Sequence, residues 1–188
     1  MPASAMNDEE VRTRLLDAAE ALFYADGIQA VGMDRIRTES GVPLKRLYRL
    51  YPAKESLVTA YLERRDQRWT ASLRNAVTGS ADPVGAVFDW LAQWFSEPDF
   101  RGCAFLNAYG ELGAGPAGVL DVVRRHKAEL RALLAGIAGP GREGLAEQLL
   151  LLVEGATVVA ALEPGPGAAV RAREAAYVLV REGDAATR

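Results

Sequence analysis

Apolar residues recur along most of this chain at the three- and four-residue spacing of an α-helix. The first such face consists of Val11, Leu15, Ala18, Ala19, Leu22 and Phe23. Similar runs, separated by glycine and proline, predict about nine helices. We find no run of alternating polar and apolar residues bounded by turn signals, which is what a half-buried strand would show. The pattern therefore predicts an all-α fold without a sheet.

The stretch from Met33 to Lys54 predicts two short helices joined by a tight turn. The turn centres on Gly41, because glycine adopts a positive φ without steric cost. Pro43 follows, with φ already set for the first turn of a helix that ends near Leu50. Two helices joined by a glycine turn are typical of a helix-turn-helix DNA reader.

Charge strengthens this interpretation, although the net charge of the whole chain is −3. Between Met33 and Lys54 there are six basic and two acidic residues, a local charge of +4. A basic patch on an acidic body concentrates attraction for phosphate at one place. By charge alone, a solvated basic face on a small helical domain would explain the same residues.

The predicted DNA contacts lie on and around the second of these helices. They are Arg37, Leu44, Lys45, Arg46, Tyr48, Arg49 and Lys54. Lys45 and Arg46 stand near the helix N-terminus, from which side chains reach the edges of bases. We expect Tyr48 and Arg49 to meet phosphate or sugar. Lys54 is expected to hold a phosphate at the start of the next helix.

A long fourth helix, from about residue 53 to 77, is expected to connect two domains. Its ends are apolar on one side, and its middle is polar. We therefore divide the chain into a DNA-binding domain, residues 1–53, and a regulatory domain, residues 54–188, for ligand binding and dimerisation.

The last two predicted helices, residues 145–162 and 168–180, indicate a homodimer. The first is apolar almost all round, and a helix of that kind must be buried on every side. The two helices and their two-fold mates would form a four-helix bundle. The predicted interface residues are Leu149, Leu152, Val153, Ala156, Val159, Ala172, Ala176 and Leu179.

Aromatic and polar residues of the predicted regulatory domain could line a ligand cavity. The candidates are Trp90, Trp94, Phe95, Phe105, Asn107, Tyr109 and His126. Aromatic residues at helical spacing are more often ordinary core. The single histidine, His126, is more simply read as packed or hydrogen-bonded than as a ligand contact. Cys103 would be a redox sensor only if it were exposed with a lowered pKa, and a small buried residue is the simpler reading.

Several classes of protein are not supported by the sequence. A single cysteine allows no internal disulfide, which fits a reducing cytoplasm. The N-terminus does not read as a signal peptide, and no run of 18 apolar residues predicts a membrane span. Motifs for metalloprotease, phosphate-loop, serine-hydrolase and paired-cysteine chemistry are missing. We therefore predict no catalytic residue, no metal and no cofactor.

The segments LLDAAEALFYADG, DRIRTESGV and LYRLYPAKESLV resemble the TetR family of transcriptional regulators. The resemblance is specific over about residues 10–65. It implies an N-terminal three-helix DNA-binding domain and a larger helical domain that dimerises and usually holds a small molecule. The sequence departs from the family pattern at several positions. Arg37 and Ser40 stand where small apolar residues are usual, Val31-Gly32 stands at the usual Thr or Ser cap, and Tyr51 stands where phenylalanine is commoner.

These observations predict a cytoplasmic, dimeric regulator that binds a pseudo-palindromic operator in double-stranded DNA. The resemblance implies a repressor that an unknown small-molecule effector releases. The alternative is a small-molecule-binding or protein-interaction module without specific DNA readout. An enzyme is a distant third hypothesis, because it would leave the basic helix unexplained.

Overall fold

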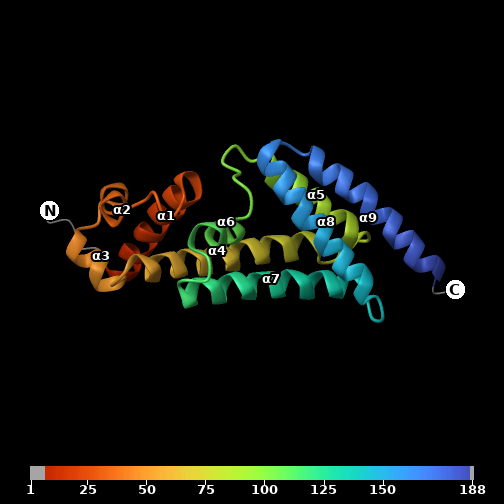
Figure 1. The fold of residues 1–188 in the computed structure, drawn as a ribbon, viewed down its shortest axis with the longest axis horizontal. Coiled ribbons are helices and arrows are strands. Elements are labelled where there is room, and N and C mark those ends of the chain that lie inside the picture. The colour runs from red at the N-terminus through yellow and green to blue at the C-terminus, as the bar shows by residue number, and fades with distance from the viewer. Residues whose placement is uncertain (1–6, 187–188) are drawn as a thin grey trace. The chain divides into compact units, whose positions relative to one another are not determined.

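The computed structural model describes residues 7–186, and these residues form nine α-helices and no strand (Figure 1). The predicted all-α fold is confirmed. The helices are α1 (Asp8–Asp26), α2 (Met33–Ser40), α3 (Leu44–Leu50), α4 (Lys54–Val77), α5 (Pro83–Phe95), α6 (Ala104–Leu112), α7 (Ala117–Ala138), α8 (Glu143–Leu162) and α9 (Gly167–Ala186).

The chain packs as two compact units, each formed from separate stretches of sequence. The first unit runs up to Arg65 and includes Ala104–Val123. The second contains Asp66–Cys103 and the chain from Arg124 onward. The predicted division at residues 53/54 was a functional one, which packing does not test. By packing, the first unit includes half of α4 and all of α6.

Helix α1 supplies much of the core of the first unit. Asn7 caps it: its side chain accepts a 2.9 Å hydrogen bond from the Glu10 N–H, and Glu10 Oε2 accepts one of 2.9 Å from the Asn7 N–H. This reciprocal cap satisfies two backbone donors that a helix start leaves without partners. The apolar face predicted for α1 is buried in full: Val11, Leu15, Ala18, Ala19, Leu22 and Phe23. Ile36, Leu47, Leu57 and Tyr61 of the same unit are also nearly inaccessible to solvent, and the rings of Phe23 and Tyr61 lie 5.8 Å apart, centroid to centroid.

Helices α5, α8 and α9 pack against one another in the second unit (Figure 1). Asp82 caps α5 by accepting a 2.9 Å hydrogen bond from the Gly85 N–H, and Pro83 occupies the first turn. The core combines aromatic side chains of α5 with small residues of α8 and α9. Ala156, Ala160, Ala169 and Ala176 let these helices approach closely.

Helix α8 differs from the other helices in how apolar it is. Among the described residues, it is the one helix long and apolar enough to cross a membrane by length and composition alone. Seven of its side chains are nevertheless buried inside the protein. A core helix of a soluble protein passes the same test, so its composition is weak evidence for a membrane span.

Candidate nucleic-acid interface

The turn between α2 and α3 is formed by Gly41 and by the buried side chain of Ser40. Gly41 has a φ of 65°, in the left-handed region that glycine tolerates best. Ser40 Oγ donates to the carbonyl oxygen of Arg37 at 3.4 Å and accepts from the Val42 N–H at 3.3 Å. Ser40 therefore stabilises the turn with polar contacts, where the family pattern has a small apolar residue.

Helix α3 is anchored by Leu47 and exposes most of its other side chains. Leu47 has no exposed surface, whereas Leu44 and Tyr48 are 37% and 43% exposed. Lys45 and Arg49 are exposed as well. The helix therefore presents a face of mixed apolar and basic character to solvent.

Asp8, in the first turn of α1, binds two arginines of α3. Its Oδ1 accepts from Arg46 Nη2 at 3.0 Å and from Arg49 Nη2 at 2.5 Å. The hydrogen bond from Arg46, together with the charge and hydrogen bond of Arg49, lowers the pKa of Asp8. This contact is not predictable from the sequence, because an aspartate is also favoured in the first turn of a helix for reasons that involve no arginine. Only the folded chain brings it to α3.

Two other predicted DNA contacts have partners within the protein. Lys54 Nζ lies 3.4 Å from the Gln29 carbonyl oxygen and 6.0 Å from the centroid of the Phe23 ring. Partial burial lowers the pKa of Lys54, and the charge of Glu111 opposes that shift. Arg37 Nε lies 3.4 Å from Asp34 Oδ1 on an exposed surface. Both cations must exchange these contacts for phosphate if they bind DNA.

Glu111, near the end of α6, holds the connection between α1 and α2. Its two carboxylate oxygens accept from the Ile28 N–H at 3.0 Å and the Gln29 N–H at 2.8 Å. The Gln29 side chain donates in return to the Glu111 carbonyl oxygen. A Cβ on Gly27 would lie 3.1 Å from Glu111 Oε2, so the connection passes close to the carboxylate. Sequence reasoning missed this contact and ended the helix near Tyr109.

Four of the predicted effector-site residues lie in the second unit, where three of them meet Trp69. The Trp69 ring is 5.0 Å from that of Trp90, 5.7 Å from Trp94 and 4.9 Å from His126, centroid to centroid. Phe95 packs against Trp94 at 5.6 Å. These residues form one aromatic cluster, with polar groups at its edge. Trp90 Nε1, for example, donates to Ser72 Oγ at 3.0 Å.

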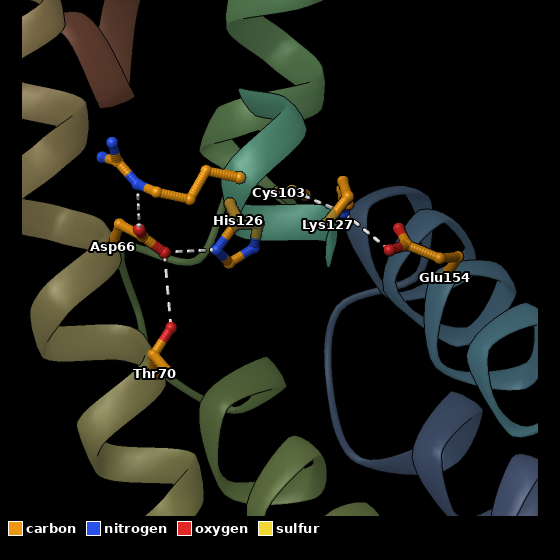
Figure 2. A network of polar contacts seen from close by, with 7 residues as sticks. Asp66, Thr70, Cys103, His126, Lys127 and Glu154 are labelled. Atoms are coloured by element: carbon orange, nitrogen blue, oxygen red, sulfur yellow. Dashed lines mark hydrogen bonds and ion pairs between the residues drawn. The ribbon is translucent and has the colours of Figure 1, made fainter. Parts of the chain in front are cut away.

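His126 and Asp66 form a buried polar pair beside this cluster (Figure 2). His126 Nδ1 lies 2.8 Å from Asp66 Oδ1, a distance at which an Nδ1–H donates to a carboxylate. Thr70 Oγ1 donates to the same oxygen at 3.3 Å, and Arg125 Nε lies 3.7 Å from Asp66 Oδ2. His126 is therefore a packed, hydrogen-bonded histidine. Asp66 lies in the polar middle predicted for the fourth helix, and the sequence pattern gives no indication that its side chain is buried.

The remaining candidates for the effector site lie on α6, in the first unit. Phe105 is buried, whereas Asn107 and Tyr109 are exposed. A shallow cavity of about 220 Å³ at the turn between α7 and α8 contains none of the predicted residues. It is lined by Ala135, Gly136, Gly139, Pro140, Arg142 and Glu143.

Cys103 is buried, with a lysine ammonium close to its sulfur (Figure 2). Lys127 Nζ lies 3.5 Å from Cys103 Sγ and 2.6 Å from Glu154 Oε1. The ion pair with Glu154 is the shorter of the two contacts. Burial of Cys103 agrees with its reading as a small packing residue.

The predicted dimer interface stays a prediction, and burial within the protomer narrows it. Five of its eight residues are buried within the chain's own core: Leu149, Val153, Ala156, Ala172 and Ala176. They have little surface to offer to a second chain. Leu152 and Leu179 are partly buried against the same core, and Val159 is 38% exposed. Because α8 is apolar all round, its sequence does not separate the inner from the outer side.

Other apolar side chains of α8 and α9 are exposed. They are Leu151 at 71%, Val158 at 53%, Leu162 at 82%, Val170 at 39% and Val178 at 44%. Residues 151, 158 and 162 follow helical spacing and so lie on one side of α8. This exposed side is the apolar surface that α8 has available for a partner.

A glycine turn, a helix anchored by one leucine and a basic outer face define a helix-turn-helix protein. Comparison with known proteins agrees. The family model "Bacterial regulatory proteins, tetR family" matches residues 15–61. The solved structure of SCO4454, a TetR-family transcriptional regulator from Streptomyces coelicolor, is 32% identical, with a TM-score of 0.79. That match covers 93% of this chain and 96% of the other.

Two curated relatives come from mycobacteria. The uncharacterized HTH-type transcriptional regulator Rv1255c of Mycobacterium tuberculosis is 27% identical over 176 residues, covering 79% of this chain and 85% of its own. The HTH-type transcriptional activator FasR of Mycolicibacterium smegmatis is 32% identical over 90 residues, 44% of this chain and 41% of its own. The chain belongs to the TetR family of DNA-binding transcriptional regulators.

Proposed function

We propose that this protein is a homodimeric repressor that binds a pseudo-palindromic operator and leaves it when a small molecule binds. The observation that carries the proposal is the exposed, basic face of α3. Leu47 fixes the helix to the core, while Lys45 and Arg49 remain exposed on its outer side. A protein with this role works in the cytoplasm, where it has access to DNA.

In the proposed complex, α3 enters the major groove of the operator. Lys45 has no ion-pair or hydrogen-bond partner among the described residues, so it is available to donate to O6 and N7 of guanine. Arg46 is the second candidate base contact, once released from Asp8. Tyr48, Arg49, Lys54 and Arg37 are assigned to phosphate and sugar, which position the protein without reading sequence.

The dimer is proposed to form through the sides of α8 and α9 on which apolar side chains remain exposed in the protomer. Exposed leucine and valine side chains on both helices would be covered by their two-fold mates. The two copies of α3 would then lie about one turn of DNA apart, roughly 34–36 Å. That spacing is what makes the operator a pseudo-palindrome.

The effector is proposed to bind in the second unit at the aromatic cluster of Trp69, Trp90 and Trp94. Aromatic walls with a few polar groups are typical of small-molecule sites. Ser72 and His126 supply such groups at its edge. The effector would release DNA only if it binds the free protein more tightly than the DNA-bound protein. Because three tryptophans meet there, intrinsic fluorescence provides a direct assay of effector binding.

Selection from a pool of random duplex DNA, using the full-length chain, tests the proposal. The expected result is one enriched sequence with two inverted half-sites. Enrichment of no sequence at moderate salt would refute specific DNA readout and favour the alternative, a ligand-binding or interaction module. Analytical ultracentrifugation of the complex should show two chains on each operator.

The sign of regulation needs its own experiment, because one curated relative is named as an activator. Transcription in vitro from a promoter that carries the selected operator should fall when the protein is added. A rise in transcript would assign the protein as an activator while leaving its DNA binding intact.

A further inference from the structure

Helix α3 carries an apolar pair on a surface that is otherwise polar. Among the described residues of α1 to α4, the only large hydrophobic side chains classed as exposed are Leu44 and Tyr48. A single exposed leucine needs no explanation. These two residues, however, are four positions apart, which brings side chains together on one side of a helix.

The position of the pair connects it with DNA. Leu44 is the first residue of α3, and the N-terminal residues of a recognition helix are the ones that reach base edges. Its neighbours on the exposed side are the cations Lys45 and Arg49. A protein partner with an apolar surface would have to desolvate these cations, whereas DNA pairs them with phosphate and guanine.

The chemistry of leucine then restricts what Leu44 can read. Leucine has no donor or acceptor, so it cannot pair with the polar edges of guanine, adenine or cytosine. If it faced one of them, it would displace water from a group that it cannot satisfy. In the major groove only thymine presents an apolar group, its C5 methyl.

We infer that Leu44 determines specificity by contacting the C5 methyl group of a thymine in each half-site, while the neighbouring Tyr48 keeps the phosphate or sugar contact assigned to it above. Lys45, the next residue along the helix, would read a guanine close to that thymine. The inference rests on the proposed DNA-binding function and adds a base identity to it.

Removal of single methyl groups from the operator tests the inference. Each thymine of the selected duplex is replaced in turn by deoxyuridine, which lacks the C5 methyl and keeps the same base pairing. For the natural protein, one thymine per half-site should show about fourfold weaker binding, corresponding to one buried carbon at about 0.8 kcal/mol. Fluorescence anisotropy of a labelled duplex gives the dissociation constants. No protein variant is needed for this measurement, so it does not depend on whether a mutant folds.

A double-mutant cycle then assigns the methyl contact to Leu44. In Leu44→Ala the thymine and uracil duplexes should bind equally well. The matched control is Leu106→Ala, the same change at a leucine of nearly the same exposure, 36% against 37%, on α6. This control should keep the fourfold difference.

The outcomes separate the inference from the function on which it rests. A selection that enriches no sequence overturns both. A successful selection in which no uracil substitution weakens binding overturns the inference alone. So does a methyl effect that persists in Leu44→Ala, because another group would then be reading the thymine.

Discussion

At the scale of single residues, Asp8 would compete with DNA for the arginines of α3 in the proposed complex. One carboxylate oxygen binds both Arg46 and Arg49 in the free protein. These contacts hold the two side chains in place, but they must break before either arginine can bind DNA. We therefore expect Asp8 to lower the affinity for the proposed operator.

We predict that Asp8→Asn binds its operator more tightly, by about two- to fivefold, which is the range expected for loss of one exposed ionic competitor. The matched control is Glu9→Gln, which removes one negative charge from the same helical turn. Glu9 has no arginine partner among the described residues. Dissociation constants at one fixed salt concentration compare the two variants. Equal gains would show that general charge, and not the Asp8 contact, sets the affinity.

Lys45 and Lys54 make a matched pair for separating base from phosphate contacts. Lys45→Ala should cost about 1–3 kcal/mol on the selected operator and relax its sequence preference. Lys54→Ala should weaken all sequences alike and reduce the salt slope by about 1. Competition binding against scrambled duplexes at several salt concentrations distinguishes the two. A sequence-dependent loss in Lys54→Ala would contradict its assignment to phosphate.

Part of this residue-level picture was predictable from the sequence. The spacing of Leu47 between polar neighbours fixed which side of α3 faces the core, and with it the exposed basic face. Neither the Asp8 contact nor that of Ser40 could be predicted. The arginine partners of Asp8 are 38 and 41 positions away, and a serine before a turn glycine gives no indication of burial.

At the scale of elements, the end of α6 is bound to the α1–α2 connection through Glu111. A carboxylate can accept from two neighbouring N–H groups at once, which is how Glu111 binds Ile28 and Gln29. This contact joins two parts of the first unit that are far apart in sequence, since α6 begins more than fifty residues after the end of α3.

We predict that Glu111→Gln destabilises the protein by about 1–2 kcal/mol, since one of two charge-assisted hydrogen bonds is lost and the amide NH₂ faces a donor. Urea unfolding monitored by circular dichroism measures the change. Glu129→Gln serves as control, because Glu129 is similarly half-buried and has no hydrogen-bond or ion-pair partner among the described residues. A loss of the same size in the control would show that Glu111 has no special role.

A second element contact gives a pH dependence. Asp82 caps α5 and also accepts a hydrogen bond from Tyr177 of α9. The hydrogen bond from Tyr177, followed by that from the Gly85 N–H, lowers the pKa of Asp82. A lowered pKa in the folded state stabilises the protein above the ordinary aspartate pKa of about 3.9, and this stabilisation is lost as the pH falls through the lowered value.

We therefore predict that the natural protein loses more stability than Asp82→Asn between about pH 5 and pH 3, because asparagine has no proton to gain in this range. Urea midpoints at the two pH values provide the comparison. Identical losses in both proteins would exclude Asp82 as a source of the acid sensitivity.

The elements themselves were largely predictable, since glycine and proline mark most of their ends. Helix α6 continues through Gly110 to Leu112, although glycine is a poor helix former and its position favours an earlier end. Helix α9 was predicted to end near Val180 and runs to Ala186. Terminal turns depend on tertiary contacts more than on local preference, so their limits are the least predictable part of an element.

At the scale of the whole molecule, the proposed regulator needs a second copy of itself. The apolar composition of α8 and α9 indicated that need from sequence, but the residues chosen for the contact were mostly core. Amphipathic spacing identifies the inner side of a helix only when the outer side is polar. Burial in the folded chain, which sequence does not report, was required to locate the exposed side.

We predict that Leu151→Lys produces a monomer and abolishes tight operator binding, because a charge would replace a 71%-exposed leucine at the centre of the proposed contact. Sedimentation equilibrium measures the mass, and circular dichroism confirms that the variant folds. Leu106→Lys, the same change on α6, should remain dimeric. A dimer that persists in Leu151→Lys would place the interface elsewhere.

The exposed side of α8 also affects the fate of the newly made chain. In a single chain, Leu162, 82% exposed, and Leu151 lie in water. If the proposed dimer forms, a cell that makes few copies leaves each new chain without a partner for a long time. During this time the chain is exposed to chaperones, proteases and aggregation. The steady-state amount of the regulator would then rise more steeply than its rate of synthesis. The rate of dimerisation rises with the square of the chain concentration, whereas the rate of degradation of single chains rises only in proportion to it.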